Sequence, residues 1–357
     1  MSATYDALML VSFGGPEGPA DVLPFLRNVT RGRDIPEARL AVVAEHYQHF
    51  GGVSPINAQC QELIAALRPA LDAAGISLPL YWGNRNWTPL LADTLAQMRA
   101  DGVRRALALV TSPYGSYSSC RQYLDDIDAA RAAVGDGAPV VDKIRHYHDH
   151  PGYITPHADA VRRAWRDLSD VDPAAVRLVF TAHSIPSAME ETSGPPRIPA
   201  QGLGGPPADS KATDGGRYSA MLRETATLVA SAAAPGRPWD LVWQSRSGSP
   251  RVPWLEPDIN DHLAALAAEG VRGVVVSPIG FISDHLEVVW DLDTEAADTA
   301  KSLGLRYVRA ATPGTDPRFV EMVRDLIRER LDPSVPRPRL GSVPVWDTCP
   351  VGCCLPR

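Results

Sequence analysis

Short apolar runs alternate along the chain with polar, helix-like segments. Four of these runs pass directly into a turn rich in small residues, proline or glycine, namely 7-ALMLVSFGG, 106-ALALVTSPYG, 177-RLVFTAHSIP and 272-RGVVVSPIGF. Further strand candidates are 78-LPLYWGN, 140-VVDKI and 240-DLVWQS. Continuous apolar runs, unlike alternating ones, are typical of parallel strands that are buried on both faces. The pattern therefore predicts an α/β fold in which helices cover both faces of parallel sheets.

Segments with helical apolar spacing fill the intervals and close on a glycine, for instance residues 57–75, 89–102 and 258–270. The strand–helix unit repeats through two halves, residues 1–150 and 151–330. In open α/β sheets, ligands bind beyond the carboxyl ends of the strands. The strand-end turns should therefore converge on one cleft between the halves, and the side chains that they carry are Phe13, Tyr117, His183 and Asp284.

Two segments lie outside this pattern. Residues 193–216 are rich in glycine and proline and are expected to form a flexible loop. The tail, residues 331–357, has too many prolines for a helix and too few apolar side chains for a core of its own. Some other interaction must therefore hold the tail against the protein.

Composition and charge narrow the class of protein. At 357 residues the chain is long enough for two domains, and its formal net charge of -7 argues against general nucleic-acid binding. No apolar run reaches the roughly 18–20 residues of a membrane span, and the N-terminus lacks a basic region and a cleavage site. We therefore expect a cytoplasmic protein without integral membrane association.

Acidic residues crowd the segment that follows the strand near residue 275. On an α-helix starting near Ser283, the carboxylates of Asp284, Glu287, Asp291 and Glu295 would share one face. Like charges four residues apart destabilise a helix, so such a row is favoured where it meets a cation or a proton path. The alternative is a capping box from Asp284 to Glu287, which would not account for the other two acids. Both interpretations stay open.

Histidines occur at two places where chemistry is plausible. His183 directly follows an apolar strand, which suits a general base or a metal ligand, and we expect it to face the acidic row from the opposite half of the molecule. The alternative is a histidine hydrogen-bonded within its turn. His146, His148 and His150 alternate, which would place them on one strand face as a metal site. A strand that ends in a turn at His150 is the commoner cause of such a pattern.

The odd number of cysteines, five, argues against a disulfide framework. Cys349, Cys353 and Cys354 lie close together in the tail, where thiolates bound to zinc or to an iron–sulfur centre could anchor the chain. Cys120, in a strand-end turn, is a candidate fourth ligand. Cys60 lies on the apolar face of a predicted helix and is expected to be a buried small residue. No dinucleotide-binding glycine motif and no Walker A loop is present.

The chain resembles the ferrochelatases, and most closely the actinobacterial coproporphyrin III ferrochelatases. The resemblance extends nearly end to end and rests on residues 8–33, 51–57, 82–89, 181–186, 243–259 and 278–295. It implies two Rossmann-like, chelatase-type halves that enclose a porphyrin cleft. It also implies an enzyme of haem biosynthesis that inserts Fe(II) into coproporphyrin III to form coproheme.

The resemblance assigns roles to the histidine and to the acidic row. His183 matches the essential histidine of the family, and Glu287 matches its acidic partner across the cleft. Both are implied in binding the substrate Fe(II) or in removing porphyrin protons. Asp291 and Glu295, together with Asp284, match an acidic path that leads away from the site, in a helix that is partly π-type in the family.

Further roles follow from the same resemblance. The residues implied in porphyrin binding are Phe13, Ser54, Arg85 and Tyr117. Phe13 stands where coproporphyrin enzymes of the Bacillus type have an iron-coordinating tyrosine. The residues that resemble the ligands of a [2Fe–2S] cluster are Cys120, Cys349, Cys353 and Cys354. The adjacent pair Cys353-Cys354 departs from the spacing in animal enzymes.

The arginines near the N-terminus bear on the substrate. Coproporphyrin carries four propionates, which favours a cleft mouth with arginines such as Arg27, Arg31, Arg33 and Arg85. For the first three, solvated surface charge is the alternative. Between Phe25 and Gly51 the chain lacks the long apolar lip of membrane-associated ferrochelatases.

Two rival functions stay open. The first is a chelatase for another metal or tetrapyrrole, for example cobalt or protoporphyrin IX. The second is a non-catalytic haem or metal carrier. For the function that the resemblance implies, the expected partners are coproporphyrin III and ferrous iron, with no nucleic acid. Transient contact with other enzymes of the haem pathway is also expected.

Overall fold

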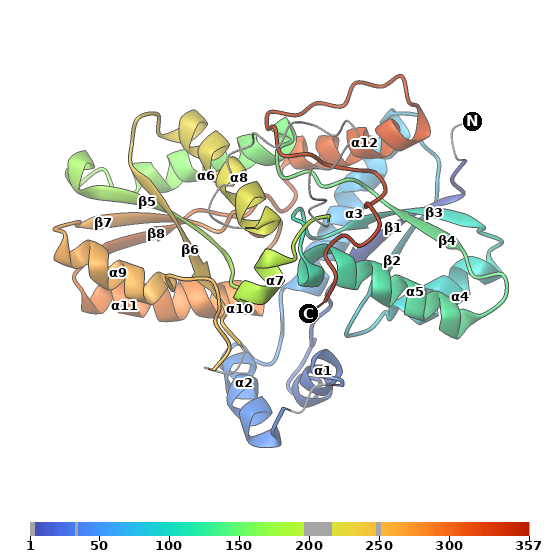
Figure 1. The fold of residues 1–357 in the computed structure, drawn as a ribbon, viewed down its shortest axis with the longest axis horizontal. Coiled ribbons are helices and arrows are strands. Elements are labelled where there is room, and N and C mark those ends of the chain that lie inside the picture. The colour runs from blue at the N-terminus through green and yellow to red at the C-terminus, as the bar shows by residue number, and fades with distance from the viewer. Residues whose placement is uncertain (1–3, 33–34, 196–215, 248–250, 357) are drawn as a thin grey trace, which may run out of the picture.

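The computed structural model describes residues 4–32, 35–195, 216–247 and 251–356. Two four-stranded sheets form its framework, and the strands within each sheet pair in parallel (Figure 1). The first has the order β2-β1-β3-β4 and contains β1 (Ala7–Ser12), β2 (Leu80–Asn84), β3 (Arg105–Val110) and β4 (Val140–Lys143). The second has the order β6-β5-β7-β8 and contains β5 (Val176–His183), β6 (Trp239–Gln244), β7 (Gly273–Ser277) and β8 (Arg306–Arg309).

Helices flank both sheets, as the apolar pattern predicted. The α-helices are α1 (Val22–Val29), α2 (Glu37–His49), α3 (Ile56–Ala73), α4 (Leu91–Ala100), α5 (Gln122–Val134), α6 (Pro151–Arg166), α7 (Ser187–Glu191), α8 (Arg217–Ala233), α9 (Ile259–Ala268), α10 (Leu286–Val288), α11 (Ala297–Ser302) and α12 (Pro317–Leu331). Two π-helices, η1 (Tyr117–Arg121) and η3 (Val289–Ala296), and one 3-10 helix, η2 (Pro173–Ala175), complete the elements.

The apolar pattern located the central strands well. Every residue of β1 and β7 is buried, because helices cover both faces of each sheet. The predicted helices at 57–75, 89–102 and 258–270 are confirmed as α3, α4 and α9, and the glycine that follows each has a positive φ of 71°, 80° and 91°. Sequence reasoning missed β8, which pairs with β7 at the edge of its sheet. Its sequence, RYVR, is only half-buried and lacks an apolar run.

A single hydrophobic cluster joins the two sheets. It contains Leu8 and Leu10 of β1, Leu178 and Phe180 of β5, and several residues of α12. Helix α12 follows the second sheet in the chain but packs against both α3 and α6. The two halves therefore share packing through α12, and the boundary at residue 150 stays a prediction. Residues 196–215 of the predicted flexible loop, 193–216, lie outside the described residues.

A second connection between the halves is polar. The hydroxyls of Tyr114 and Tyr153 both donate a hydrogen bond to the carbonyl oxygen of Ile279, each at 2.7 Å. Tyr114 follows β3 of the first sheet, and Ile279 follows β7 of the second. All three residues are buried. Two donors fill both lone pairs of one buried carbonyl, so this junction fixes how the sheets meet.

The tail runs back over the body without forming a helix or strand and ends near the middle of the molecule (Figure 1). Arginines hold it in place. Arg145 binds Glu329 of α12 at 2.7 and 2.8 Å and also donates to the carbonyl oxygen of Pro338 at 3.3 Å. Arg339 of the tail donates to the buried Asp149 at 2.8 Å. Charged hydrogen bonds thus hold the segment that the sequence showed to be too poor in apolar residues.

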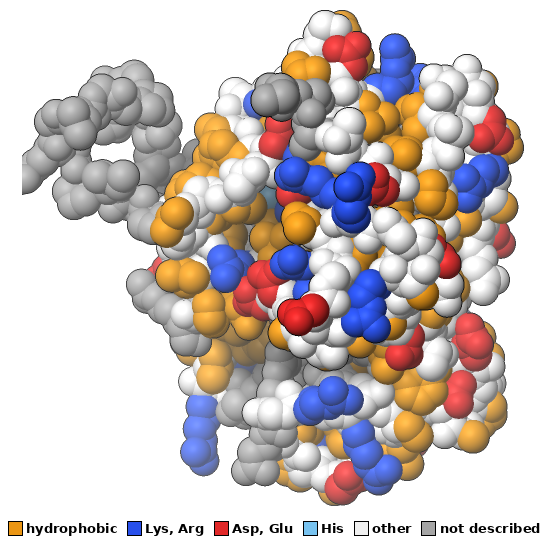
Figure 2. Space-filling model, turned by 90° about the vertical axis from the view of Figure 1, so that its right-hand side faces the viewer, with side chains coloured by type: hydrophobic (Ala, Val, Ile, Leu, Met, Phe, Trp, Pro, Cys, Tyr) orange, Lys and Arg blue, Asp and Glu red, His pale blue; other side chains and the backbone are white. Residues whose placement is uncertain are grey.

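The surface of the molecule is mixed in charge on the side of the first half. Figure 2 shows basic and acidic side chains interspersed over that face, with apolar side chains between them. Within the ranges described above, no helix combines the length and the apolar character that crossing a membrane requires.

Substituting Glu329→Gln should lower the free energy of unfolding by about 3 kcal/mol, because the Arg145 guanidinium would remain buried without its counter-charge. Both side chains of this pair are only 1% exposed. A shift of the urea midpoint to lower concentration, followed by circular dichroism, measures the effect. Asp170→Asn is the control, since its pair with Arg306 is more than half exposed and should contribute about 0.5 kcal/mol or less. Equal midpoints for the two variants would contradict this account of the tail.

Candidate functional site

The candidate site lies at the carboxyl ends of β5 and β7. His183 is the last residue of β5, and Glu287 lies in α10, after the turn that follows β7. Because β5 and β7 are hydrogen-bonded neighbours, their carboxyl ends meet at one edge of the second sheet. The His183 Nε2 atom is 3.6 Å from the Glu287 carboxylate. The prediction that these two residues come from opposite halves is wrong, because both follow strands of the same sheet.

The His183 ring has a defined proton arrangement. Its Nδ1 atom bonds the carbonyl oxygen of Ser184, and a carbonyl can only accept, so Nδ1 carries the hydrogen. In the neutral ring, Nε2 therefore carries the free lone pair, and this atom faces Glu287. The two side chains are 32% and 47% exposed, so a ligand can reach them. This arrangement can accept a proton or hold a metal ion.

The acidic row continues along a π-helix rather than along a regular α-helix. After the short α10, residues 289–296 form η3. π-helical segments are uncommon and occur frequently at functional sites. Asp291 is in this segment and accepts hydrogen bonds from the hydroxyl of Ser245 and, at 3.4 Å, from Gln244. Ser245 adopts a positive φ of 61°, which is unusual for a residue other than glycine.

Burial makes the Asp291 carboxyl group a weaker acid than usual. Burial raises the pKa of Asp291 to about 7, although the Ser245 hydrogen bond opposes the shift. The charges of Glu287 and Glu295 raise the pKa of Asp291 further, so the three acids influence one another. A carboxyl group of this pKa can both take up and release a proton near neutral pH.

Asp284 does not share the stripe. The N-cap of α10 is His285, so the helix begins at Leu286 rather than near Ser283. The Asp284 carboxylate instead binds Arg309 through two hydrogen bonds of 3.1 Å and accepts another from Thr312 at 3.2 Å. Both the shared face with Asp284 and the capping box are therefore wrong.

The residues implied in porphyrin binding lie mainly on the first half. Phe13 follows β1, and Arg85 follows β2 with its guanidinium 5.6 Å from the centroid of the Phe13 ring and 4.5 Å from that of Tyr123. The Arg85 side chain is only 6% exposed and is paired with Asp126. Ser54 is buried. Arg85 is thus neutralised rather than free for a propionate.

Other predicted residues of the first half are placed as follows. Tyr117 begins η1 and is half-buried. Arg27 is paired with Glu37 at 3.0 Å, and Arg31 donates to Asn28 at 2.6 Å; both lie on or just after α1, which projects from the body together with α2 (Figure 1). Arg33 lies outside the described residues. The hydrogen-bond partner of the Arg31 guanidinium is therefore neutral.

A cavity of about 190 Å³ adjoins the site, and its lining includes Ser184, Trp243 and Arg246. Ligand pockets commonly measure about 300–1,000 Å³, so this cavity is too small to be a tetrapyrrole site by itself. The cleft between the halves stays a prediction.

The alternating histidines do not form one site. His150 accepts a hydrogen bond from the Gly152 amide at 3.0 Å and thereby caps α6. His148 binds Glu224 at 3.0 Å, and these two lie with Asp149 in a group whose potential ligand atoms are within 4.8 Å of one another. His146 belongs to neither arrangement. The alternative of a three-histidine metal site is therefore wrong. His150 does close a turn, through a bond from its amide to the Tyr147 carbonyl oxygen at 3.0 Å, but β4 ends at Lys143 and does not reach it.

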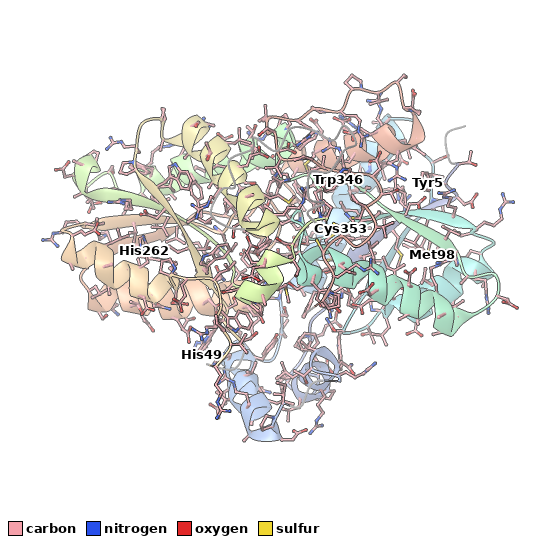
Figure 3. The ribbon with its side chains drawn as sticks, in the orientation of Figure 1. Tyr5, His49, Met98, His262, Trp346 and Cys353 are labelled. Atoms are coloured by element: carbon pink, nitrogen blue, oxygen red, sulfur yellow. The ribbon has the colours of Figure 1, made fainter. Side chains whose placement is uncertain are left out.

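The four cysteines of the predicted cluster are neighbours. The sulfur atoms of Cys353 and Cys354 are 3.7 Å apart, and Cys349 hydrogen-bonds with both Cys120 and Cys353. These hydrogen bonds lower the pKa of Cys349, and the positive charge of Lys143 also lowers it. Figure 3 shows Cys353 and Trp346 on the tail where it crosses the middle of the molecule. Four neighbouring thiols are compatible with free cysteines or with a bound metal centre, so the cluster is not identified by this arrangement.

Cys60 is separate from this group, as expected. It lies in the hydrophobic cluster under β1, and burial raises the pKa of its thiol to about 11.

Sequence reasoning missed several polar residues around the site. Ser245 ends a predicted strand next to Gln244, which was a signal for the same strand-end edge. Lys143 lies one residue before the end of another predicted strand, 140-VVDKI, yet nothing in its sequence context indicated that it would be buried beside thiols. Tyr218 donates a hydrogen bond of 3.0 Å from its hydroxyl to the His183 carbonyl oxygen. It follows a Gly/Pro-rich segment, and nothing in the local sequence indicated this contact.

Known proteins resemble this chain over nearly its whole length. A sequence model of the family described as ferrochelatase matches residues 5–331. A protein named coproporphyrin III ferrochelatase from Nocardia farcinica is 54% identical over 359 residues, which cover 99% of this chain and 97% of that protein. A protein of the same name from Streptomyces griseus is 51% identical and covers 99% of this chain and 94% of its own length.

One solved structure, SirB from Bacillus subtilis with Fe3+, has a TM-score of 0.49 and 12% identity, and the match covers 92% of this chain and 96% of that one. The family match and the two relatives extend over nearly all of the sequence. By these matches, the chain belongs to the ferrochelatase family.

Proposed function

We propose that this protein inserts Fe(II) into coproporphyrin III to form coproheme. The observation that carries the proposal is the pair His183 and Glu287, 3.6 Å apart at the carboxyl edge of the second sheet. Support comes from the 54% identity to a protein named coproporphyrin III ferrochelatase. The protein is then a metal–porphyrin chelatase, a lyase of haem biosynthesis.

The chemistry requires a base and a route for protons. A free-base porphyrin loses two pyrrole protons as one Fe(II) enters, and the iron remains ferrous, so no oxidant or reductant is consumed. The free Nε2 of His183 accepts one pyrrole proton and passes it to the Glu287 carboxylate, and it then accepts and passes on the second proton in the same way. Imidazole and carboxylate also suit Fe(II), and two such ligands hold it less firmly than the four porphyrin nitrogens that receive it.

Asp291 continues the proton route. Its pKa of about 7 lets the ionised form take a proton from the Glu287 side and pass it to Glu295, which lies farther along the same helix. The hydroxyl of Ser245 holds the Asp291 carboxylate in place during this exchange. Asp284, which is bound to Arg309, has no part in the relay that we propose.

We assign the apolar contact with the substrate to Phe13 and a propionate contact to the exposed Arg31. The Phe13 ring cannot ligate iron, so we assign it to apolar contact with the macrocycle, with the Arg85 guanidinium holding its position. Ser54 and Tyr117 line the same edge of the first sheet in this proposal. Arg31, whose partner Asn28 is neutral, is the candidate for a propionate.

For the tail we propose a [2Fe–2S] cluster held by Cys120, Cys349, Cys353 and Cys354. The donor set fits by position, because the sulfur atoms of Cys353 and Cys354 are 3.7 Å apart and Cys349 contacts both Cys120 and Cys353. Four thiolates around such a cluster leave about two negative charges. Two cations beside the thiols, Lys143 and Arg217, can offset them. When bound, the cluster would supply a one-electron redox centre and a cross-link between tail and body.

A cytoplasmic location and transient contacts with other haem-pathway enzymes remain predictions that go with this function.

Anaerobic assays with purified protein test the function. Fe(II) and coproporphyrin III should be metallated faster than Fe(II) with protoporphyrin IX, and faster than Co(II) or Zn(II) with coproporphyrin III. His183→Ala should lower kcat by about 100-fold, because the base is removed. Absorption spectra of the product porphyrin report the rate.

His262→Ala is the matched control for His183→Ala. The His262 ring, on α9, binds Asp240 at 3.1 Å, and Figure 3 places it in the outer part of the second half. This variant should keep the wild-type rate. Tight porphyrin binding without turnover would indicate a carrier, and preference for cobalt or for protoporphyrin IX would indicate a different chelatase. Undiminished activity of His183→Ala would contradict the assigned base.

Asp291→Asn should remove one inflection from the pH dependence of kcat. The raised pKa means that Asp291 is neutral below about pH 7 and ionised above it. Since the relay needs the ionised form to accept a proton, wild-type kcat should fall as the pH drops through about 7. The variant should be about tenfold slower at pH 8, with that inflection lost. Asp293→Asn is the control, because Asp293 is on the same helix but binds Arg309. An unchanged inflection in Asp291→Asn would rule out the relay.

The tail proposal predicts a coloured protein. Purified anaerobically, it should absorb visible light, lose that absorption with dithionite, and contain iron and acid-labile sulfide in equal amounts. Cys349→Ser should lose the colour, whereas Cys60→Ser should keep it because Cys60 lies in the apolar core. Colourless protein with stoichiometric zinc would replace the cluster with a zinc site.

A further inference from the structure

Tyr218, at the start of α8, contacts the backbone of the candidate base. Its hydroxyl donates a hydrogen bond of 3.0 Å to the carbonyl oxygen of His183. The ring is 4% exposed, stacks on Trp243 with 5.9 Å between centroids, and meets Tyr114 edge-on at 6.1 Å. Burial raises the pKa of Tyr218, so the hydroxyl keeps its hydrogen and remains a donor.

This contact completes the fixing of one peptide group. The peptide between His183 and Ser184 carries the carbonyl that Tyr218 binds and the amide that donates to the Gln244 carbonyl oxygen at 2.8 Å. It is therefore held from α8 on one side and from β6 on the other. The His183 ring bonds the next carbonyl, that of Ser184, so a rotation of this peptide would turn the ring and move Nε2 relative to Glu287.

The backbone of Tyr218 is in turn tied to the tail. The Tyr218 amide donates to the Ser193 hydroxyl at 3.0 Å. The next residue, Gly194, donates its amide to the Cys354 sulfur at 3.1 Å and accepts from the Cys354 amide at 2.9 Å. A continuous set of contacts thus runs from Cys354 through Ser193 and Gly194 to Tyr218 and His183.

We propose that Tyr218 is a positioning residue for His183, and that the Cys354 end of the tail stabilises Tyr218 through Ser193 and Gly194. The inference rests on the proposed role of His183 and goes beyond it. It assigns a task to the tail, which is to keep the base aligned with Glu287. Neither Tyr218 nor Ser193 touches the reacting atoms.

Tyr218→Phe in the full-length protein tests the first link. It removes one hydroxyl from a buried ring, and kcat with coproporphyrin III should fall about tenfold while KM changes less than about twofold, because the base is misaligned and substrate contacts are kept. Tyr147→Phe is the matched control. Tyr147 is also a buried tyrosine, and its hydroxyl donates to the backbone carbonyl of Val110 at 2.9 Å. Removing this hydroxyl should leave kcat and KM unchanged.

Ser193→Ala tests the second link without altering a thiol. Its kcat should fall about threefold, and the double variant with Tyr218→Phe should be no slower than Tyr218→Phe alone, since both act on one path. Losses that multiply would overturn the tail link, and an unchanged kcat in Tyr218→Phe would overturn the positioning role.

Hydrogen–deuterium exchange separates this inference from the proposed function. Amides of residues 183–195 should exchange faster in Tyr218→Phe and in Ser193→Ala than in wild type, but not in Tyr147→Phe. Faster exchange in a protein that does not metallate coproporphyrin III would refute the function and keep the structural link. Unchanged exchange in both variants would refute the link, whatever the activity.

Discussion

The carbonyl oxygen of Ile279 is the point on which the arrangement of the two halves depends. Tyr114 and Tyr153 saturate it from two different elements, and all three groups are buried. Ile279 follows β7, only a few residues before the acids of the site. A movement of the first half against the second that separated these groups would break the bonds. Such a movement is opposed, since an unpaired carbonyl in this interior costs free energy. The candidate site is thus built directly onto the junction between the sheets.

The tail shows how a segment without an apolar core can still be ordered. Its interactions include arginine–carboxylate pairs and hydrogen bonds from the backbone amides of Ser342 and Val343 to the half-buried Glu224. Burial would raise the pKa of Glu224, but hydrogen bonds from His148 and from the tail amides of Ser342 and Val343 lower it to about 2. Glu224 therefore stays ionised at any ordinary pH and continues to accept these bonds. Such pairing depends on charges far apart in sequence, which is why the tail's binding surface was not evident from its composition.

The local apolar pattern predicted the central strands and the position of His183 at the end of one of them. It could do so because apolar runs that end at small residues are typical of buried parallel strands. It failed for β8, which has no such run, and for the start of the helix after β7. There, the spacing of Asp284 from Glu287 is that of a capping box, but the Asp284 carboxylate binds Arg309, which lies 25 residues away in the sequence. Tyr218 could not be predicted either, since its contact with His183 depends on how α8 packs against α6 and β6.

The distribution of the site residues over the two sheets has a mechanical consequence. His183 ends β5 of the second sheet, and Glu287 and Asp291 lie in α10 and η3, which follow β7 of the same sheet. Phe13, Arg85 and Tyr117 instead follow strands of the first sheet. A change in the separation of the halves would therefore alter the space for a flat ligand and leave the distance from His183 to Glu287 unchanged. The proton-accepting pair would keep its geometry while a porphyrin enters or leaves. Had the base and its carboxylate come from opposite halves, any such change would also have altered the distance between them.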